Sequence, residues 1–315
     1  MQILDLCAGT GAFSHIFHEY DDRFSTVMAN DFAKESEQIY KLNFPNTPFI
    51  LKDIHNVKDI PDHNIMIAGF SCQPFSICGE RKGFDDERSN VFWRIIQIMA
   101  DKTPQIVIFE NVKNLLTHDN GNTFTRIKQS IQEHGYHIKY VLLDTAVHTE
   151  IPQHRERVYI LCFQSKDLAD KINLKFEPVK TQKIKKYLED DISDTYYYSD
   201  RFKPFNVIQE GVVNMDSLYQ FRRHYVRENK SGLCPTLTAN MGGGGHNVPL
   251  LKDNKGIRKL TPRECFNLQG FPRDYLLPDI ADSKLYKLAG NAVSPPIVKL
   301  IVDRLIQAID TIIKN

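Results

Sequence analysis

The sequence lacks the features of several large protein classes. No apolar run among its 315 residues reaches the length that spans a bilayer, so a membrane protein is not expected. The chain opens with MQILDLCAGTGAF, which has neither a basic segment nor a cleavage site, and this predicts no signal peptide. It also has no internal repeat and no low-complexity tail. What remains is an ordinary globular chain, long enough for one large domain or two modest ones.

Cysteine is present but is not arranged for cross-linking or for metal. None of the six cysteines belongs to a C-x-x-C pair. In a chain of this size, that scatter predicts reduced thiols in a cytosol; it does not predict a disulfide framework or a zinc site. We expect no metal. The six cysteines are Cys7, Cys72, Cys78, Cys162, Cys234 and Cys265.

Charge of one sign is also missing, since the formal net charge is +1. The charges are nevertheless unevenly distributed. Residues 1–60 contain five Lys or Arg against nine Asp or Glu, a balance of −4, whereas residues 201–260 contain ten against four, a balance of +6. Solvated faces would explain such counts, but an acidic first segment and a basic later one can also perform different tasks on one molecule.

Short apolar runs alternate with amphipathic stretches over residues 1–165. This alternation, with Val, Ile and Leu in the runs, predicts a parallel sheet with helices on both faces. The last two strands have a short link, so one of them can run antiparallel. The expected strands are 2–8, 25–30, 64–70, 105–111, 138–144 and 157–163. The expected helices are 12–20, 33–43, 89–101 and 122–134.

The amino-acid composition changes between about residues 166 and 260. This part is charged and tyrosine-rich, and SGLCPTLTANMGGGGHNVP (231–249) is rich in turn residues, with four consecutive glycines. We predict a second, less regular domain here. The stretch 294–313 then reads as an amphipathic helix whose apolar stripe needs a partner, and the sheet of the first domain is the expected one.

A glycine turn follows the first expected strand in DLCAGTGAF (5–13). Gly9 and Gly11 would let a ligand approach the backbone at the start of the following helix. Asp31 lies about 20 residues on, the position that binds ribose hydroxyls in nucleotide-binding folds. Asp53 ends a third element and could accept from an adenine amino group. Each aspartate alone could be a helix cap or turn former. Without a full G-x-G-x-x-G pattern, an adenosine ligand smaller than a dinucleotide fits better, such as S-adenosylmethionine.

Cys72 follows the apolar strand NIMIAGF (64–70) in the segment GFSCQPFS. A buried cysteine is most often an inert small hydrophobe. This one, however, follows the carboxyl end of a strand, where open α/β sheets bind ligands, and Pro74 stiffens the turn behind it. An accessible thiol beside cations or helix dipoles can lose its proton and act as a nucleophile.

Charged residues mark two further strands. Glu110 closes the hydrophobic strand QIVIFE, a costly position for a carboxylate unless it is paired or functional. Neighbouring strands would then deliver a thiol and a carboxyl to one cleft. In QHRERVYI (153–160), Arg155 and Arg157 alternate and share a face if the segment is extended, so either could meet an anion or a base edge. A surface arginine pair is the alternative.

These motifs together resemble the DNA (cytosine-5) methyltransferases, and most of all the bacterial single-chain, HhaI-like type. DLCAGTGAF, GFSCQPFS, ENV, QHRER, RKLTPRECFNLQGFP and LAGNAVSPP follow one another in the order and spacing of that family. Six motifs in order are far more specific than any one of them, and they cover almost the whole chain. The resemblance implies a Rossmann-like methyltransferase sheet, S-adenosyl-L-methionine as cofactor with S-adenosyl-L-homocysteine as product, and double-stranded DNA as partner.

The resemblance also implies roles for individual residues. The catalytic residues would be Cys72 as the nucleophile on cytosine C6, Glu110 on the N3 and N4 edge of the base, and Arg157 with Arg155 in support. The cofactor would contact Leu6, Cys7, Ala8, Gly9, Thr10, Gly11, Asp31, Phe32, Asp53, Ile54, Gly69, Phe70, Asn291 and Ala292. DNA would contact Gln73, Ser76, Cys78, Arg88, Arg222, Arg223, Arg227, Thr236, Gly242 and Gly243.

Three residues depart from the pattern of the family. Ser71 stands where the residue before the nucleophile is usually proline, and Cys7 stands where phenylalanine is usual. Cys78 replaces a serine of the loop 73–91, which would close over DNA. Because Gln73 and Pro74 are present, we expect activity with an altered turn.

The resemblance divides the chain into three parts. Residues 1–180 with 285–315 would form the catalytic and cofactor-binding domain, 181–258 the target-recognition domain, and 259–284 a hinge. A base inside a duplex cannot reach a catalytic pocket, so the target cytosine must be flipped out. The basic second domain would hold the duplex by its phosphates while a few side chains read base edges. We expect a cytoplasmic, nucleoid-associated monomer, with a cognate restriction endonuclease encoded nearby but not in contact with it.

Two alternatives remain open at this point. One is the same chemistry on tRNA, although the Cys-Phe-Thr segment of enzymes with that activity is not found. The other is a catalytically dead binding module, against which the retention of Cys72, Glu110 and both arginines argues. The target sequence is not readable, although 236–249 resembles recognition segments of enzymes that methylate GC-rich palindromes.

Overall fold

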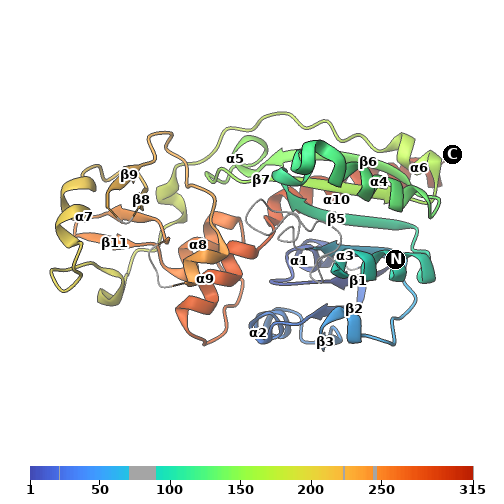
Figure 1. The fold of residues 1–315 in the computed structure, drawn as a ribbon, viewed down its shortest axis with the longest axis horizontal. Coiled ribbons are helices and arrows are strands. Elements are labelled where there is room, and N and C mark those ends of the chain that lie inside the picture. Colours follow the sequence, from blue (N-terminus) through green and yellow to red (C-terminus); the bar gives the residue numbers. More distant parts are fainter. Residues whose placement is uncertain (21, 71–89, 223, 244–246, 315) are drawn as a thin grey trace. The chain divides into compact units, whose positions relative to one another are not determined.

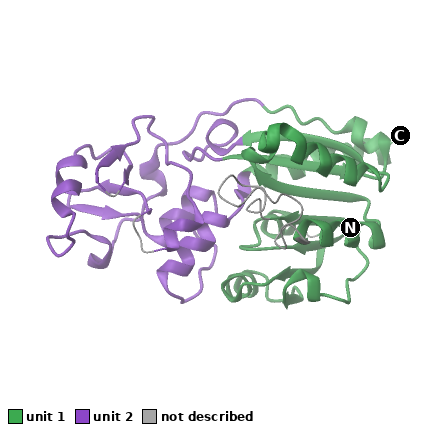
Figure 2. Ribbon diagram, viewed as in Figure 1, with its two compact units in different colours: residues 1–143, 156–176, 297–315 green, residues 144–155, 177–296 purple. Residues whose placement is uncertain are grey.

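The computed structural model describes residues 1–20, 22–70, 90–222, 224–243 and 247–314. The chain forms two compact units, coloured in Figure 2, and each is described by itself. Unit 1 comprises 1–143, 156–176 and 297–315, and unit 2 comprises 144–155 and 177–296. This division places 144–155 and 285–296 in unit 2, although the sequence assigned both segments to a catalytic domain. The functional boundaries proposed from the sequence stay a prediction.

Unit 1 is built on a seven-stranded sheet in the order β3-β2-β1-β4-β5-β7-β6 (Figure 1). The pairs β1–β2, β2–β3, β1–β4 and β4–β5 are parallel, and β5–β7 is antiparallel. One of the last two strands was expected to reverse, and this is confirmed for β7. The strands are β1 (Gln2–Leu6), β2 (Ser25–Asp31), β3 (Phe49–Leu51), β4 (Ile65–Gly69), β5 (Ile106–Val112), β6 (His137–Asp144) and β7 (Glu156–Phe163).

Both faces of the central strands β1, β4 and β5 are buried, because successive strand residues point to opposite faces and almost all of them are buried, whereas the edge strand β6 is partly exposed. One face, with Leu4, Met66 and Phe109, packs against α3 and α4 in a continuous apolar cluster. On the other face, Asp5 accepts a hydrogen bond from Ser14 of α1 at 2.8 Å. Helices therefore cover both faces, as predicted. The early helices are α1 (Ala12–His18), α2 (Lys34–Asn43), α3 (Asn90–Lys102), α4 (Asn122–Gln132) and α6 (Lys166–Lys171), with short 3₁₀ turns at Ile54–Asn56, Lys113–Leu116 and His118–Gly121.

The helix α10 (Pro295–Ile313) confirms the amphipathic helix expected at 294–313. Its apolar stripe is buried, and its polar side is tied to residues after α1: Lys299 pairs with Glu19 at 2.6 Å and Arg23 with Asp310 at 2.7 Å. Tyr20 also donates to Asp303. The buried residues of the stripe are Ile297, Val298, Ile301, Val302, Leu305 and Ala308.

Unit 2 is less regular, as predicted from its composition. Its core is a small sheet in the order β11-β10-β8-β9, all antiparallel, covered by α7. Its strands are β8 (Tyr219–Phe221), β9 (Val226–Glu228), β10 (Leu250–Lys252) and β11 (Ile257–Lys259). Its helices are α5 (Thr145–His148), α7 (Phe205–Gly211), α8 (Pro262–Gln269) and α9 (Asp282–Asn291), with 3₁₀ turns at Ile184–Tyr187, Asp194–Tyr196 and η9 (Ala239–Gly242).

Among the described residues, no helix is both long and apolar enough to cross a membrane.

Candidate active site and nucleic-acid interface

The order of the sheet in unit 1 reverses between β1 and β4. In open α/β sheets, ligands bind outside the carboxyl ends of the strands at such a switch point. The segments that leave these two strands are the glycine turn after Leu6 and the residues after Gly69. The predicted cofactor and catalytic motifs thus follow the two strands that the topology favours.

The turn after β1 is held open by three residues with left-handed backbone. Cys7, Gly9 and Gly11 have φ of 54°, 55° and 70°. A side chain at Gly11 would also collide with the ring of Phe44, 2.5 Å from the position of a Cβ atom. The positive φ at Cys7 is unusual for a residue with a side chain. The turn is therefore fixed by close packing as well as by glycine flexibility.

Asp31, at the end of β2, ties this turn to the next strand. Its Oδ2 accepts from the backbone N–H of Gly9 at 2.9 Å, and its Oδ1 accepts from that of Ala33, also at 2.9 Å. Burial raises the pKa of this carboxyl, against the lowering effect of these N–H groups. The sequence predicted Asp31 as a ligand for ribose hydroxyls. The structure shows in addition that the same carboxylate organises the glycine turn.

The residues around Asp31 would suit an adenosine ligand. Phe32 is 77% exposed, which is unusual for an aromatic residue directly after a buried strand, and its ring could stack on a base. Asp53 is also accessible and receives hydrogen bonds from the backbone N–H of His55 at 2.9 Å and from its ring; these bonds lower the pKa of Asp53. The other predicted cofactor residues lie close by and are mostly buried: Leu6 ends β1, Ala8 and Thr10 belong to the glycine turn, and Ile54 follows Asp53.

Glu110 is paired with Arg157 across the antiparallel strands β5 and β7. Arg157 Nε lies 3.1 Å from Glu110 Oε1, and both side chains are about six-sevenths buried, with 15% and 14% exposed. Glu110 is also directly opposite Gly69 in the parallel pair β4–β5. A Cβ atom at Gly69 would lie 3.8 Å from Glu110 Oε2, in ordinary van der Waals contact, so Gly69 is directly beside the carboxylate. The residue after Gly69, Phe70, packs its ring against the rings of Phe92 and Phe109.

Arg155 has different surroundings from Arg157. It lies before β7, belongs to unit 2 and is 2% exposed. Its guanidinium donates to the backbone carbonyls of Leu237 at 2.9 Å, Gly290 at 3.2 Å and Ala292 at 2.7 Å. The alternation in QHRER therefore does not bring the two arginines to a common partner. Arg155 ties three backbone segments of unit 2 together.

Sequence reasoning missed the other members of this buried tie. Gln153 is fully buried, donates to the Leu268 carbonyl at 2.7 Å and accepts from the Leu237 N–H at 3.1 Å. Gln269, also fully buried, donates to the Ala289 carbonyl at 2.5 Å. The only indication in the sequence was that the motifs QHRER and NLQGFP each contain a glutamine. Of the predicted cofactor residues here, Ala292 is buried in this tie and Asn291 is exposed at the end of α9.

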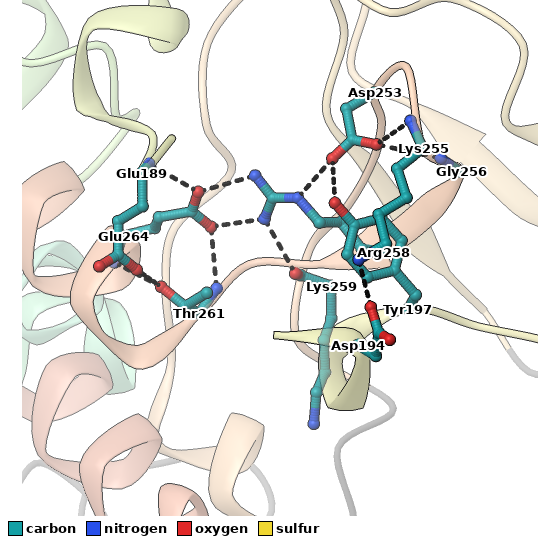
Figure 3. Close-up of polar contacts among 10 residues, drawn as sticks. All are labelled: Glu189, Asp194, Tyr197, Asp253, Lys255, Gly256, Arg258, Lys259, Thr261 and Glu264. Carbon is teal, nitrogen blue, oxygen red and sulfur yellow. Dashed lines mark hydrogen bonds and ion pairs between the residues drawn. The ribbon is translucent and has the colours of Figure 1, made fainter. Parts of the chain in front are cut away.

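A second buried network organises the start of α8 (Figure 3). Arg258 and Glu264, 2% and 0% exposed, form two parallel hydrogen bonds of 2.8 Å. Glu264 also accepts from the backbone N–H of Thr261 at 2.9 Å, closing a capping box, and Arg258 donates to Asp253 at 2.9 Å. RKLTPRE therefore has a structural role, and its network extends to Asp253 and to the backbone N–H of Glu189. From the sequence, this segment was recognised only as one of the motifs that resemble the family.

The described cysteines are poor nucleophiles. Burial, with help from Asp31 and Asp5, raises the pKa of the Cys7 thiol to about 12, and burial also raises the pKa values of Cys162, Cys234 and Cys265. Such thiols stay protonated at neutral pH. No cluster of potential metal ligands occurs in the described part of the chain.

Several predicted residues lie outside the described residues. They are Cys72, Gln73, Ser76, Cys78, Arg88 and Arg223, as well as Ser71 and most of the predicted loop 73–91.

The predicted DNA contacts of unit 2 fall in two hollows. Arg222, Arg227 and Thr236 line a groove of about 650 Å³ beside β8 and β9. Gly242 and Gly243 line a neighbouring hollow of about 430 Å³ next to α9. Gly242 has a packing reason that the sequence did not reveal, since a Cβ there would lie 2.4 Å from the carbonyl oxygen of Ser283.

Comparisons with known proteins show the family of the chain. The family model described as C-5 cytosine-specific DNA methylase matches residues 1–307. Type II methyltransferase M.Bsp6I of Bacillus sp. (strain RFL6) is 45% identical over 311 residues, covering 97% of this chain and 98% of the relative. Type II methyltransferase M.HhaI of Haemophilus parahaemolyticus is 35% identical over 93% of this chain and 90% of its own. A crystal structure of a Spodoptera frugiperda DNMT2 mutant has a TM-score of 0.75 over 97% of this chain and 99% of its own; at 18% identity this likeness concerns the fold alone.

Proposed function

Because the chain belongs to the C-5 cytosine-specific DNA methylase family and is a type II DNA cytosine-5 methyltransferase, we propose that Cys72, Glu110 and Arg157 carry out its chemistry. The observation that carries this proposal is the paired Glu110–Arg157 at the end of β5, directly opposite Gly69 of β4. Cys72 follows Gly69 by three positions in the sequence.

Each residue has a defined task in the proposed reaction. The Cys72 thiolate adds to C6 of a flipped-out cytosine, which makes C5 nucleophilic. Glu110 binds the N3 and N4 edge of the base, and Arg157 holds the Glu110 carboxylate in position. After C5 has gained the methyl group, loss of the C5 proton lets the thiolate leave. Arg155 acts as a positioning residue through the carbonyls that it binds in unit 2.

S-adenosyl-L-methionine is the proposed cofactor, and when bound it supplies a methyl group attached to a sulfonium. Residues at the ends of β1, β2 and β3 would hold it: the backbone of the glycine turn, the carboxylates of Asp31 and Asp53, and the exposed ring of Phe32. Asn291, the last residue of α9, is also proposed as a cofactor contact. The proposed product is S-adenosyl-L-homocysteine.

The proposed substrate is a specific sequence in double-stranded DNA. We assign target recognition to 181–258, with 259–284 as a hinge, on the basis of the basic balance of 201–260 and the groove lined by Arg222 and Arg227. We propose that the protein is a monomer in the cytoplasm and is associated with the nucleoid. We also propose that it has a cognate restriction endonuclease, which does not contact it.

The experiment uses labelled S-adenosylmethionine with plasmid DNA and with tRNA, and compares the wild type with Cys72→Ser. We expect label in DNA only, and none with Cys72→Ser, because a neutral hydroxyl is a far poorer nucleophile than a thiolate. DNA that contains 5-fluorocytosine at the target should form an adduct that resists denaturation and maps to the peptide with Cys72. Label in tRNA, or wild-type turnover by Cys72→Ser, would contradict the proposal.

A further inference from the structure

The groove of unit 2 contains a polar residue that the sequence did not single out. Gln220 is the central residue of β8 and lines the groove together with Arg222 and Arg227. Arg222 donates from its guanidinium Nη2 to Gln220 Oε1 at 3.0 Å. Gln220 is also directly opposite Arg227 in the antiparallel register of β8 and β9. Because opposed residues share a face, the three side chains form one polar surface, the Gln220 face.

The hairpin that carries this face is rigidly supported from behind. Tyr219 and Phe221, on the other face of β8, are buried in the small core of unit 2 with residues of α7, β10 and β11. Gly211 of α7 lies so close to β9 that a Cβ there would be 2.6 Å from the Cβ of Val226. At the end of β9, Glu228 accepts from Ser217 at 2.8 Å. The strands behind the Gln220 face are therefore packed against a buried core.

The chemistry of the groove fits nucleic acid. None of its described lining residues is acidic, whereas Arg222 and Arg227 are both basic and exposed. The remaining lining side chains are mainly hydroxyls and amides, among them Asn229, Thr236 and Asn247. A two-stranded β-ribbon fits the major groove of DNA, where arginine most often reads guanine by a fork of two hydrogen bonds to O6 and N7.

From this geometry we infer that Gln220 is a specificity-determining positioning residue, which holds the guanidinium of Arg222 so that its other N–H groups read one guanine of the target. The inference rests on the proposed function. The role that we assign to Gln220 is to position Arg222, because its Oε1 accepts from that guanidinium. Holding the fork in advance matters, since an ordered side chain loses less conformational freedom on binding.

The test measures methylation of duplexes that differ from the target at one base pair each. The target is first read by bisulfite sequencing of a plasmid methylated by the wild-type protein. Gln220→Met keeps the length of the side chain and removes the acceptor. We expect about a tenfold loss of discrimination at one guanine, the same position at which Arg222→Lys loses discrimination. Gln220→Glu, which keeps an acceptor for Arg222, should retain that preference.

Gln209→Met is the matched control, because Gln209 is an exposed glutamine of α7 outside the groove, and it should leave the profile unchanged. The inference is overturned if Gln220→Met keeps the wild-type profile, weakens methylation of all sequences alike, or changes a position different from that of Arg222→Lys. If Gln220→Met does not fold, the preference of Gln220→Glu at the Arg222 position decides. A wild-type protein that methylates no cytosine in DNA would instead refute the proposed function.

Discussion

Glu110 and Arg157 lie on neighbouring antiparallel strands and form an ion pair of 3.1 Å whose two side chains are equally buried. Arg157 is opposite Val112 in the register, so its side chain reaches back along the strand to Glu110. A second bond, from Arg157 to the carbonyl of Glu156 at 2.8 Å, fixes the guanidinium. The carboxylate is thereby held in one orientation before any substrate arrives.

Arg157→Ala should lower the rate of methyl transfer by on the order of a hundredfold, the scale expected when a catalytic group loses its position. Arg157→Lys keeps the charge but not the fork, so its rate should be intermediate. Single-turnover assays with labelled cofactor measure this, and thermal unfolding checks that the fold is intact. Wild-type turnover by a folded Arg157→Ala would show that Glu110 does not depend on this partner.

Asp31→Ala should lower the affinity for the cofactor roughly tenfold or more while leaving the affinity for DNA nearly unchanged. Hydrogen bonds to a charged acceptor are worth about 1.5–3 kcal/mol, and this substitution also releases the N–H of Gly9. Calorimetry with S-adenosyl-L-homocysteine measures the change. Asp59→Ala, at an exposed aspartate elsewhere in unit 1, is the matched control. Equal affinity of Asp31→Ala and wild type would refute the cofactor role.

Glu264→Ala should destabilise the protein by about 3 kcal/mol, because the buried Arg258 loses its two-bond partner and keeps only the partly exposed Asp253. A double substitution of Arg258→Met with Glu264→Leu removes both charges and should be less destabilising than Glu264→Ala alone. Urea unfolding, followed by far-UV circular dichroism, measures the stability of each variant. Arg258→Met and Glu264→Leu are also measured singly; if the double substitution costs as much as the sum of these two, the pair is not coupled.

Asp5 should make stability depend on pH. Burial raises the pKa of this carboxyl to about 7, while an unfolded aspartate has about 3.9. The folded state therefore binds more protons between these values, and stability should fall as the pH rises from about 4 to 7, by up to about 1.4 kcal/mol per pH unit. Above pH 7 this contribution should be level.

Asp5→Asn should flatten that part of the stability profile, since the amide cannot ionise. It retains an oxygen that can accept from Ser14, so the contact with α1 is preserved. Urea midpoints between pH 5 and 8 measure the effect. An unchanged slope in Asp5→Asn would assign the pH dependence to other groups.

The fold of unit 1 was predictable because its signals are local. Runs such as QIVIFE become strands buried on both faces, and amphipathic stretches such as that of α4 become helices, within a few residues of their expected ends. The short strand β3 was not among the predicted strands because its three residues are too few for a pattern. The antiparallel sheet of unit 2 also escaped prediction, because its strands are equally short.

The polar sites were predictable only in part. Glu110 stood out because a carboxylate is costly at the end of an apolar strand. Its pairing with Arg157 depends on strand register, which the sequence does not encode locally. Arg155 looked like Arg157 in the sequence, yet its three carbonyl partners come from residues at least 82 positions away. Gln220 carried no motif, and only the cross-strand geometry drew attention to it.

The way the chain passes between the units also bears on how the protein is made. Residues 297–315 complete unit 1, but all of 177–296, which belongs to unit 2, leaves the ribosome before them. Until α10 emerges, the apolar surface that Ile301 and Leu305 will cover stays open to water, and Arg23 has no Asp310 to pair with. During synthesis unit 2 can therefore be finished first, while the earlier-made sheet waits for its last helix. A ribosome that stops within unit 2 would release a chain with an exposed apolar surface, which is a natural substrate for chaperones and proteases.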